Sequence, residues 1–217
     1  TILADEKREK EPSTEIIRGS EAPEEYKKNP FYNSYHWGMA DWEADPRKLY
    51  LPDKSDEAIS FAIASHELGH LVDKGKIQPT RHNFEPTYQE ELRAWGKGWQ
   101  YLVKYLPEYY DNNSEMVAKL EIIKNEVEKM LMDITKLSEP FYKKTFDNKH
   151  EQRTEFLKTE AGTEIKKKMD DLKINLEKIL SANNLEEFLK PIDWPKIKGV
   201  INKALIDIKT DNKLNKE

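Results

Sequence analysis

The chain has 217 residues, enough for one substantial domain or two small ones, and its hydrophobic fraction of 37% is low but compatible with a packed core. Its 36 basic and 41 acidic residues are interleaved and leave a formal net charge of only −5, which argues against nucleic acid or an anionic membrane surface as a partner. Because cysteine is absent, disulfides, thiol nucleophiles and Cys-ligated metals are excluded, and histidines and carboxylates are the strong metal ligands that remain.

Residues 1–29 are dominated by Lys, Glu, Ser and Pro, and Ile16 and Ile17 form an isolated apolar pair. A segment of this composition cannot bury enough apolar surface to offset the entropy that it loses on ordering. We therefore expect a flexible N-terminal arm over residues 1–29.

Aromatic residues are concentrated between Phe31 and Pro52, where Gly38 and the Asp45-Pro46 pair provide turn signals. Aromatic segments separated by turn residues are typical of short strands, and Lys48 to Leu51 is the clearest of them. This region predicts a small antiparallel sheet of two or three strands.

Two helices are expected next. Residues 57–72 carry apolar side chains without an internal proline, and they follow N-cap candidates at residues 53–56. After a polar connection, Thr87 opens a second helix that should run to about Leu106 and end at Pro107. Thr87 and Glu90 have the spacing of a capping box, in which the Glu90 side chain returns to the start of the helix.

Residues 113–217 are expected to form a helical hairpin or bundle. Apolar residues recur at alternating steps of four and three along two segments, which favours coiled-coil-like pairing of the two helices. A third helix should run from Pro195 to Lys209, after the break at Pro191. The two seams consist of Met116, Leu120, Ile123, Val127, Met130, Ile134 and Leu137, and of Ile165, Met169, Leu172, Leu176 and Ile179.

The most specific motif is His66-Glu67-Leu68-Gly69-His70, inside the first expected helix. Residues four apart share a helix face, so His66 and His70 can bind one zinc ion together. Glu67 points partly toward the same cleft and can take a proton from a water molecule on the metal without occupying a coordination position. This HExxH pattern predicts a site for zinc-dependent peptide hydrolysis, with Glu67 as the catalytic base.

A catalytic zinc needs a third protein ligand. The longer pattern with a third histidine is not continued, because Asp73 and Lys76 stand where its Gly and His would be. Glu90 and Glu91 on the next helix are the alternatives. Glu91 lies at the margin of the expected buried face and Glu90 on the far side, so we favour Glu91 as the third ligand.

HExxH followed by a glutamate on a second helix resembles the gluzincin clan of metallopeptidases. The aromatic strand region before the motif and Glu91-Leu92-Arg93-Ala94-Trp95 after it resemble the minigluzincins and the ImmA/IrrE-type peptidases, over roughly Phe31 to Pro107. The resemblance implies an α+β fold in which a small antiparallel sheet is backed by an active-site helix and a glutamate helix over residues 30–112. It also implies an edge strand that binds an extended peptide. The helices after Asn112 have no counterpart in the resemblance.

Further residues are assigned secondary roles. Asp73, one turn beyond His70, could accept a hydrogen bond from a metal-bound imidazole. An oxyanion in the reaction needs a donor, and His82, Tyr88, Tyr35 and His36 are chemically able to serve. With a peptidase site in the chain, the N-terminal arm could also act as a pro-segment that covers the cleft.

The leading hypothesis is a metalloendopeptidase with one zinc ion per chain and a peptide or protein as substrate. The second is a zinc-binding regulatory protein that recognises or cleaves one partner, docked on the helices of residues 113–217, which could also form a homodimer. The third is a helical interaction protein in which the motif is accidental. No apolar run approaches the roughly 18 residues that span a bilayer, so we expect a soluble protein without membrane insertion. A cytoplasmic location is slightly favoured, and secretion after removal of a signal stays open.

Overall fold

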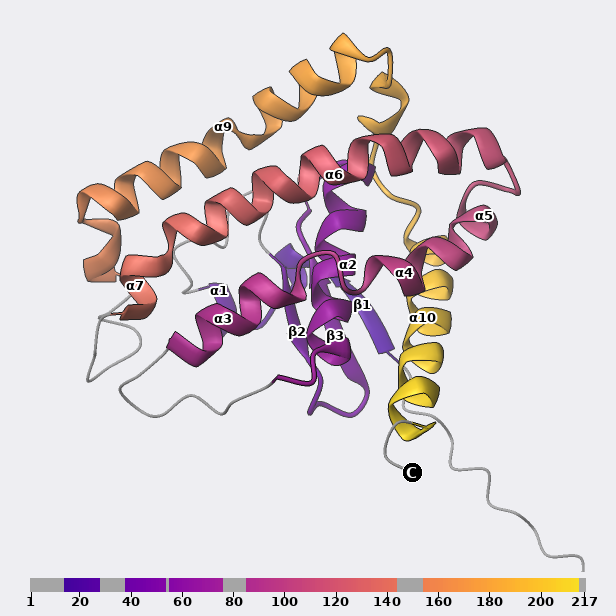
Figure 1. Cartoon of the computed structure of the whole chain (residues 1–217), viewed down its shortest axis with the longest axis horizontal. Helices are drawn as coiled ribbons and strands as arrows, with labels where there is room; N and C mark the ends of the chain where they lie inside the picture. Colours follow the sequence, from indigo (N-terminus) through magenta and orange to yellow (C-terminus); the bar gives the residue numbers. More distant parts are fainter. Residues whose placement is uncertain (1–13, 28–37, 54, 76–84, 144–153, 215–217) are drawn as a thin grey trace, which may run out of the picture.

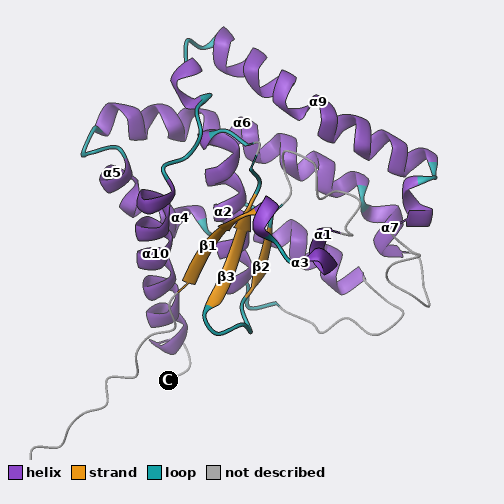
Figure 2. Ribbon diagram, turned by 180° about the vertical axis from the view of Figure 1, so that it is seen from behind, coloured by secondary structure: helices purple, strands orange, loops and turns teal. Residues whose placement is uncertain are grey.

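The sheet of the computed structural model is three-stranded and mixed (Figures 1 and 2). The structure describes residues 14–27, 38–53, 55–75, 85–143 and 154–214. β3 (Arg47–Leu51) lies in the middle; it pairs in parallel with β1 (Thr14–Arg18) and antiparallel with β2 (Met39–Asp41). The predicted strand at Lys48 to Leu51 is confirmed, but the expectation of a purely antiparallel sheet is wrong, because β1 joins it from the N-terminal segment.

The prediction of a flexible arm over residues 1–29 is therefore wrong for its second half. Ile16 is 3% exposed and packs with Leu49 in the main core, whereas Ile17 packs on the opposite face beside Tyr50. Neighbouring residues of a strand point to opposite faces, so an adjacent apolar pair suits a strand that is covered on both sides. Residues 1–13, 28 and 29 of the expected arm lie outside the described residues.

α2 (Glu57–Val72) is the central helix and has the predicted bounds. Every residue from Glu57 to Gly69 is buried. The helix contacts β3 as well as four other helices, and Figure 1 shows it in the middle of the molecule. The HExxH motif thus belongs to a helix that is enclosed on nearly all sides.

The predicted continuous helix from Thr87 to Leu106 is wrong. The chain forms α3 (Glu85–Ala94), a turn, α4 (Trp99–Leu102), a 3-10 turn (Val103–Tyr105) and α5 (Leu106–Tyr109). Gly96 interrupts the helix with a φ of +80°, a conformation that suits glycine. Pro107 does not end a helix, because it lies in the first turn of α5, where its missing N–H costs nothing.

The expected pairing of the two C-terminal seams is confirmed: α6 (Ser114–Leu137) packs along α9 (Glu160–Ala182). The predicted third helix is also present, as α10 (Trp194–Leu214), but it packs against β1, α2, α4 and α5 on the other side of the molecule. One continuous hydrophobic core runs from Ile16 to Ile208. Other short elements are α1 (Glu24–Lys27), α7 (Glu139–Lys143) and two further 3-10 turns (Gly19–Glu21 and Glu186–Phe188).

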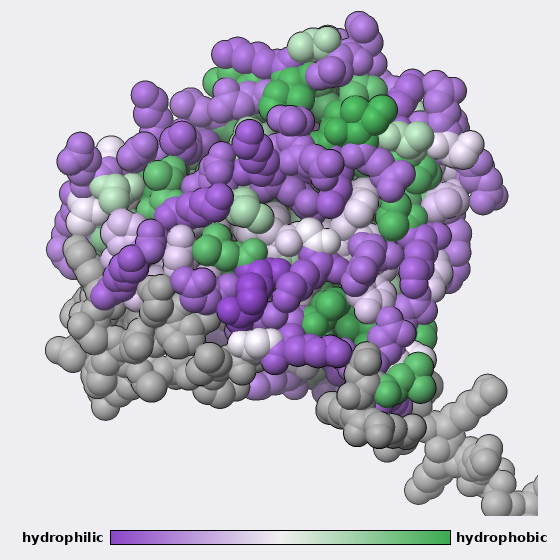
Figure 3. Space-filling model, viewed as in Figure 1, coloured by the Kyte–Doolittle hydropathy of each residue, from purple (hydrophilic) through white to green (hydrophobic). Residues whose placement is uncertain are grey.

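The face seen in Figure 3 is mainly hydrophilic, with separate hydrophobic groups between the charged side chains. Among the described residues, no helix combines the length and the apolar character that crossing a membrane requires.

Candidate metal centre

Two imidazoles from α2 form one half of the candidate centre. His66 and His70 lie one turn apart, and their Nε2 atoms are 3.2 Å from each other. The His66 side chain is 9% exposed and that of His70 13%. The helical spacing of the motif therefore brings both ring nitrogens to the same point, as predicted from the sequence.

α3 contributes the third donor. Oε2 of Glu91 lies 2.8 Å from Nε2 of His66 and 3.5 Å from Nε2 of His70. Tetrahedral zinc with bonds near 2.0–2.1 Å has ligand-to-ligand distances of roughly 3.3 Å, so the spacing of these three atoms fits zinc. Two histidines and one glutamate are also a donor set of catalytic zinc sites, in which the fourth position is open. This group could hold a metal ion.

Two glycines allow the segment that follows α3 to lie close to α2. A Cβ on Gly69 would lie 2.0 Å from the carbonyl oxygen of Ala94, and a Cβ on Gly98 would lie 2.1 Å from that of Ser65. Both distances are far below van der Waals contact, and the obstacle in each case is backbone. Glycine at these positions lets α3 lie close enough for Glu91 to reach both histidines.

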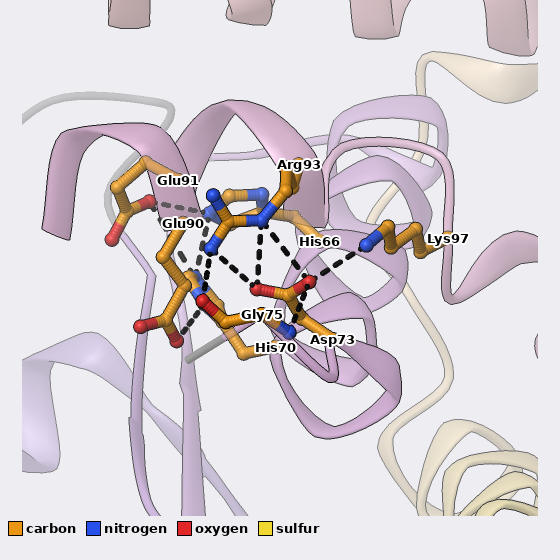
Figure 4. Close-up of polar contacts among 8 residues, drawn as sticks. All are labelled: His66, His70, Asp73, Gly75, Glu90, Glu91, Arg93 and Lys97. Atoms are coloured by element: carbon orange, nitrogen blue, oxygen red, sulfur yellow. Dashed lines mark hydrogen bonds and ion pairs between the residues drawn. The ribbon is translucent and has the colours of Figure 1, made fainter. Parts of the chain in front are cut away.

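Glu90, the neighbour of Glu91, contacts the other nitrogen of His70. Its Oε1 lies 3.0 Å from Nδ1 of His70 (Figure 4). A carboxylate in this position fixes the orientation of a metal-binding imidazole. The predicted capping box is wrong, because α3 begins at Glu85 and Thr87 lies inside it. The role of Glu90 was therefore not predicted from the sequence. The feature that could have indicated it is a second glutamate next to the expected metal ligand.

The two histidines and the two glutamates lie within hydrogen-bond distance of one another. Burial lowers the pKa of His70, but its hydrogen bonds to Glu90 and Glu91 outweigh burial and raise that pKa above its ordinary value. Burial likewise opposes ionisation of Glu91, yet the hydrogen bonds from His66 and His70 hold the pKa of its carboxyl well below the usual range.

Glu67 is buried next to the histidines and reaches toward the sheet. It is 8% exposed, and its Oε1 lies 3.6 Å from the point that a Cβ on Gly38 would occupy, just before β2. Burial raises the pKa of this carboxyl, while the charges of His66 and His70 act in the opposite direction. A carboxyl with a raised pKa is better matched to proton transfer near neutral pH.

Asp73 does not fill the place beside His70 that the sequence suggested. Its carboxylate accepts hydrogen bonds from Arg93 at 3.0 and 3.2 Å and from Lys97 at 2.7 Å (Figure 4). Arg93 also donates to the carbonyl oxygen of Gly75. Asp73 instead ties the end of α2 to the end of α3 and to the turn that follows it.

Of the four suggested oxyanion donors, only Tyr88 belongs to the described residues. It is buried in α3, and its ring packs against that of Tyr142 in α7 with 5.4 Å between ring centroids. Its role as a donor stays a prediction. His82, Tyr35 and His36 lie outside the described residues.

Comparison with protein-family models, with curated proteins and with solved structures found no match to this chain.

Proposed function

We propose that the chain is a zinc-dependent metallopeptidase that holds one zinc ion through His66, His70 and Glu91. The observation that carries the proposal is the convergence of their three donor atoms, each within 3.5 Å of the other two. A surface pair of histidines would not need a partly buried carboxylate from another helix at the same point. Zinc in this donor set would act as a Lewis acid and lower the pKa of a water ligand.

Glu67 is the proposed general base. Its carboxylate accepts a proton from the attacking water and returns that proton to the leaving amine nitrogen, so the peptide bond is replaced by a carboxylate and an amine. The residue is buried beside both histidines but is not part of the three-donor group, which leaves its oxygens available for the proton. Burial also favours the protonated form that the second half of the reaction requires.

A peptide substrate is favoured by the position of β2. This strand is terminal in the sheet order β1-β3-β2, and it starts one residue after Gly38, which faces the Glu67 carboxylate. An extended peptide can add to the edge of a sheet through backbone hydrogen bonds. A peptide bound along β2 would present its carbonyl groups next to Glu67.

The proposal is tested by cleavage of a mixture of quenched fluorescent peptides by the full chain, with Glu67→Gln as the decisive variant. Glu67→Gln keeps the size of the side chain but loses the base, so we expect zinc to remain bound and cleavage to fall by at least about 100-fold. Glu115→Gln, an exposed residue of α6, serves as the control and should cleave as the wild type does. Equal cleavage by wild type and Glu67→Gln would disprove the assignment of the base.

The same experiment addresses the regulatory alternative. A wild type that binds zinc but cleaves no peptide in the mixture would favour a protein that acts on, or only recognises, one partner. A wild type that binds no zinc would leave the helical interaction protein as the better account.

A further inference from the structure

The two histidines of the centre are oriented by different means. Nδ1 of His70 lies 3.0 Å from a Glu90 oxygen. Nδ1 of His66 is buried and has no hydrogen-bond partner among the described residues. The His66 ring instead stacks on the indole of Trp95, with 4.0 Å between ring centroids and 27° between the ring planes. Because rotation of an imidazole about its last torsion is soft, its direction must be fixed by a neighbour.

Trp95 is itself fixed by the C-terminal helices. It follows the end of α3, one turn after Glu91, and its Nε1 donates a hydrogen bond of 3.1 Å to Oγ1 of Thr135 in α6. The Thr135 hydroxyl donates its own proton to the carbonyl oxygen of Leu131, also at 3.1 Å. A hydroxyl whose proton is committed in this way presents its lone pairs in a defined direction, so it orients the indole.

We propose that Trp95 is a positioning residue that holds the His66 ring in its metal-binding orientation by stacking, and that Thr135 of α6 sets the position of Trp95. The proposal rests on the proposed zinc site and deepens it. It makes α6 a structural part of the metal centre, linked to His66 through one hydrogen bond and one ring stack. Glu90 then orients His70 through a hydrogen bond, and Trp95 orients His66 through ring stacking.

The test measures zinc affinity of the full chain by competition with a chromophoric chelator, together with the visible spectrum of the Co²⁺-loaded protein. Trp95→Leu removes the stack, Trp95→Phe keeps a stacking ring, and Thr135→Val keeps the shape of the side chain but loses the acceptor. Thr210→Val is the matched control, because Thr210 makes the same hydrogen bond to the carbonyl four residues earlier in α10 and accepts none from an indole of the described residues. Denaturant unfolding of each metal-free variant identifies those that fold.

Loss of a group that orients a ligand typically weakens metal binding about 10- to 100-fold, so we expect Trp95→Leu to fall in that range and to change the Co²⁺ spectrum. Trp95→Phe should restore affinity to within roughly threefold of wild type, and Thr135→Val should weaken it by a few fold, about 3 to 10. Thr210→Val should match the wild type.

Several results would overturn the inference. A folded Trp95→Leu variant with wild-type affinity and spectrum would do so, as would a Trp95→Phe variant no better than Trp95→Leu. If Trp95→Leu does not fold, the Thr135→Val variant provides the test. Wild-type zinc affinity and a wild-type Co²⁺ spectrum in Thr135→Val would then reject the proposal. A wild type that binds neither ion would overturn the zinc site itself, whereas wild-type affinity in the variants would overturn only the role of Trp95.

Discussion

Two adjacent glutamates have different roles at the candidate centre. Glu91 lies within 3.5 Å of both Nε2 atoms, whereas Glu90 contacts Nδ1 of His70 at 3.0 Å. We expect Glu91→Gln to weaken zinc binding by more than about 100-fold, because a coordinating charge is lost, and Glu90→Gln by about 10-fold. Chelator competition measures both. An equal loss in the two variants, or a larger loss for Glu90→Gln, would contradict these roles.

Asp73 should stabilise the fold in a pH-dependent way. Burial of its side chain, which is 1% exposed, opposes ionisation, but hydrogen bonds from Arg93 and Lys97 outweigh burial and hold its pKa well below the usual range. Since the ordinary pKa of Asp is about 3.9, the unfolded chain takes up the proton first as the pH falls. The stability that Asp73 contributes is therefore complete above about pH 5 and is lost progressively below it.

For Asp73→Asn we expect a loss of about 1–3 kcal/mol in the free energy of unfolding at pH 7, which shrinks as the pH approaches 3. Urea unfolding of the metal-free protein at a series of pH values measures this difference. Asp133→Asn is the control, since Asp133 makes an exposed ion pair at 4.0 Å that should contribute little. A difference between wild type and Asp73→Asn that does not change with pH would contradict the linkage.

The residues of the motif could be recognised from the sequence because they depend on one helical turn. His66, Glu67 and His70 need only the spacing of α2. Glu91 was favoured from the face of a continuous helix, and it reaches both histidines although that helix ends at Ala94. The partners of Asp73 and Glu90 could not be predicted in the same way. Those contacts depend on where α3 begins and on how closely it approaches α2, which are tertiary properties.

At the level of elements, the geometry of the site depends on the break between α3 and α4. Gly98 has an ordinary right-handed helical φ of −78°, so an alanine would suit its backbone, yet an added Cβ would lie 2.1 Å from the Ser65 carbonyl oxygen. We expect Gly98→Ala to destabilise the fold by about 1–3 kcal/mol through steric overlap, and to weaken zinc binding as α4 moves away from α2.

Gly199→Ala in α10 is a matched comparison for Gly98→Ala. A Cβ at Gly199 meets nothing within 4 Å, and the residue lies inside a helix. This change should stabilise the fold by about 0.5–1 kcal/mol. Denaturant unfolding of both variants checks the pair, and stabilisation by Gly98→Ala would show that the two segments are not packed as described.

The elements themselves were predictable where one periodic pattern covered them. α6, α9 and α10 were found because their apolar residues repeat at helical spacing, whereas α2 was found from an apolar stretch without proline that follows N-cap candidates. β1 was missed because only two apolar residues mark it and its partner strand lies about thirty residues later. The α6 and α9 seams also shift late in each helix, where Leu131 and Leu180 are fully buried in place of the predicted Met130 and Ile179.

For the whole molecule, the helices beyond residue 112 belong to the same core as the candidate centre. α10 packs against α2, and Asn212 donates a hydrogen bond of 3.2 Å to the carbonyl oxygen of Leu71 near the end of α2. Tyr101 and Tyr105 donate hydrogen bonds to Asp211 and Asp207 of the same helix. α10 thus supports the helix that carries both histidines.

We therefore expect a chain that ends at residue 193 to lose its cooperative fold and its zinc affinity. The deleted helix buries three isoleucines and one valine, and at roughly 2 kcal/mol for each side chain this approaches the whole stability of a typical domain. Thermal unfolding measures the effect, with a chain that ends at residue 214 as the control. A truncated chain that unfolds cooperatively and binds zinc would show that α10 is dispensable.

The proposed zinc site consists of two histidines of α2 and a glutamate of α3, with Glu67 beside it as the base. Elemental analysis of the purified full chain and its variants tests it most directly. We predict about one zinc per chain in the wild type and in Glu67→Gln, and little or none in His66→Ala or Glu91→Ala. A wild type without zinc, or undiminished zinc in His66→Ala and Glu91→Ala, would contradict the account.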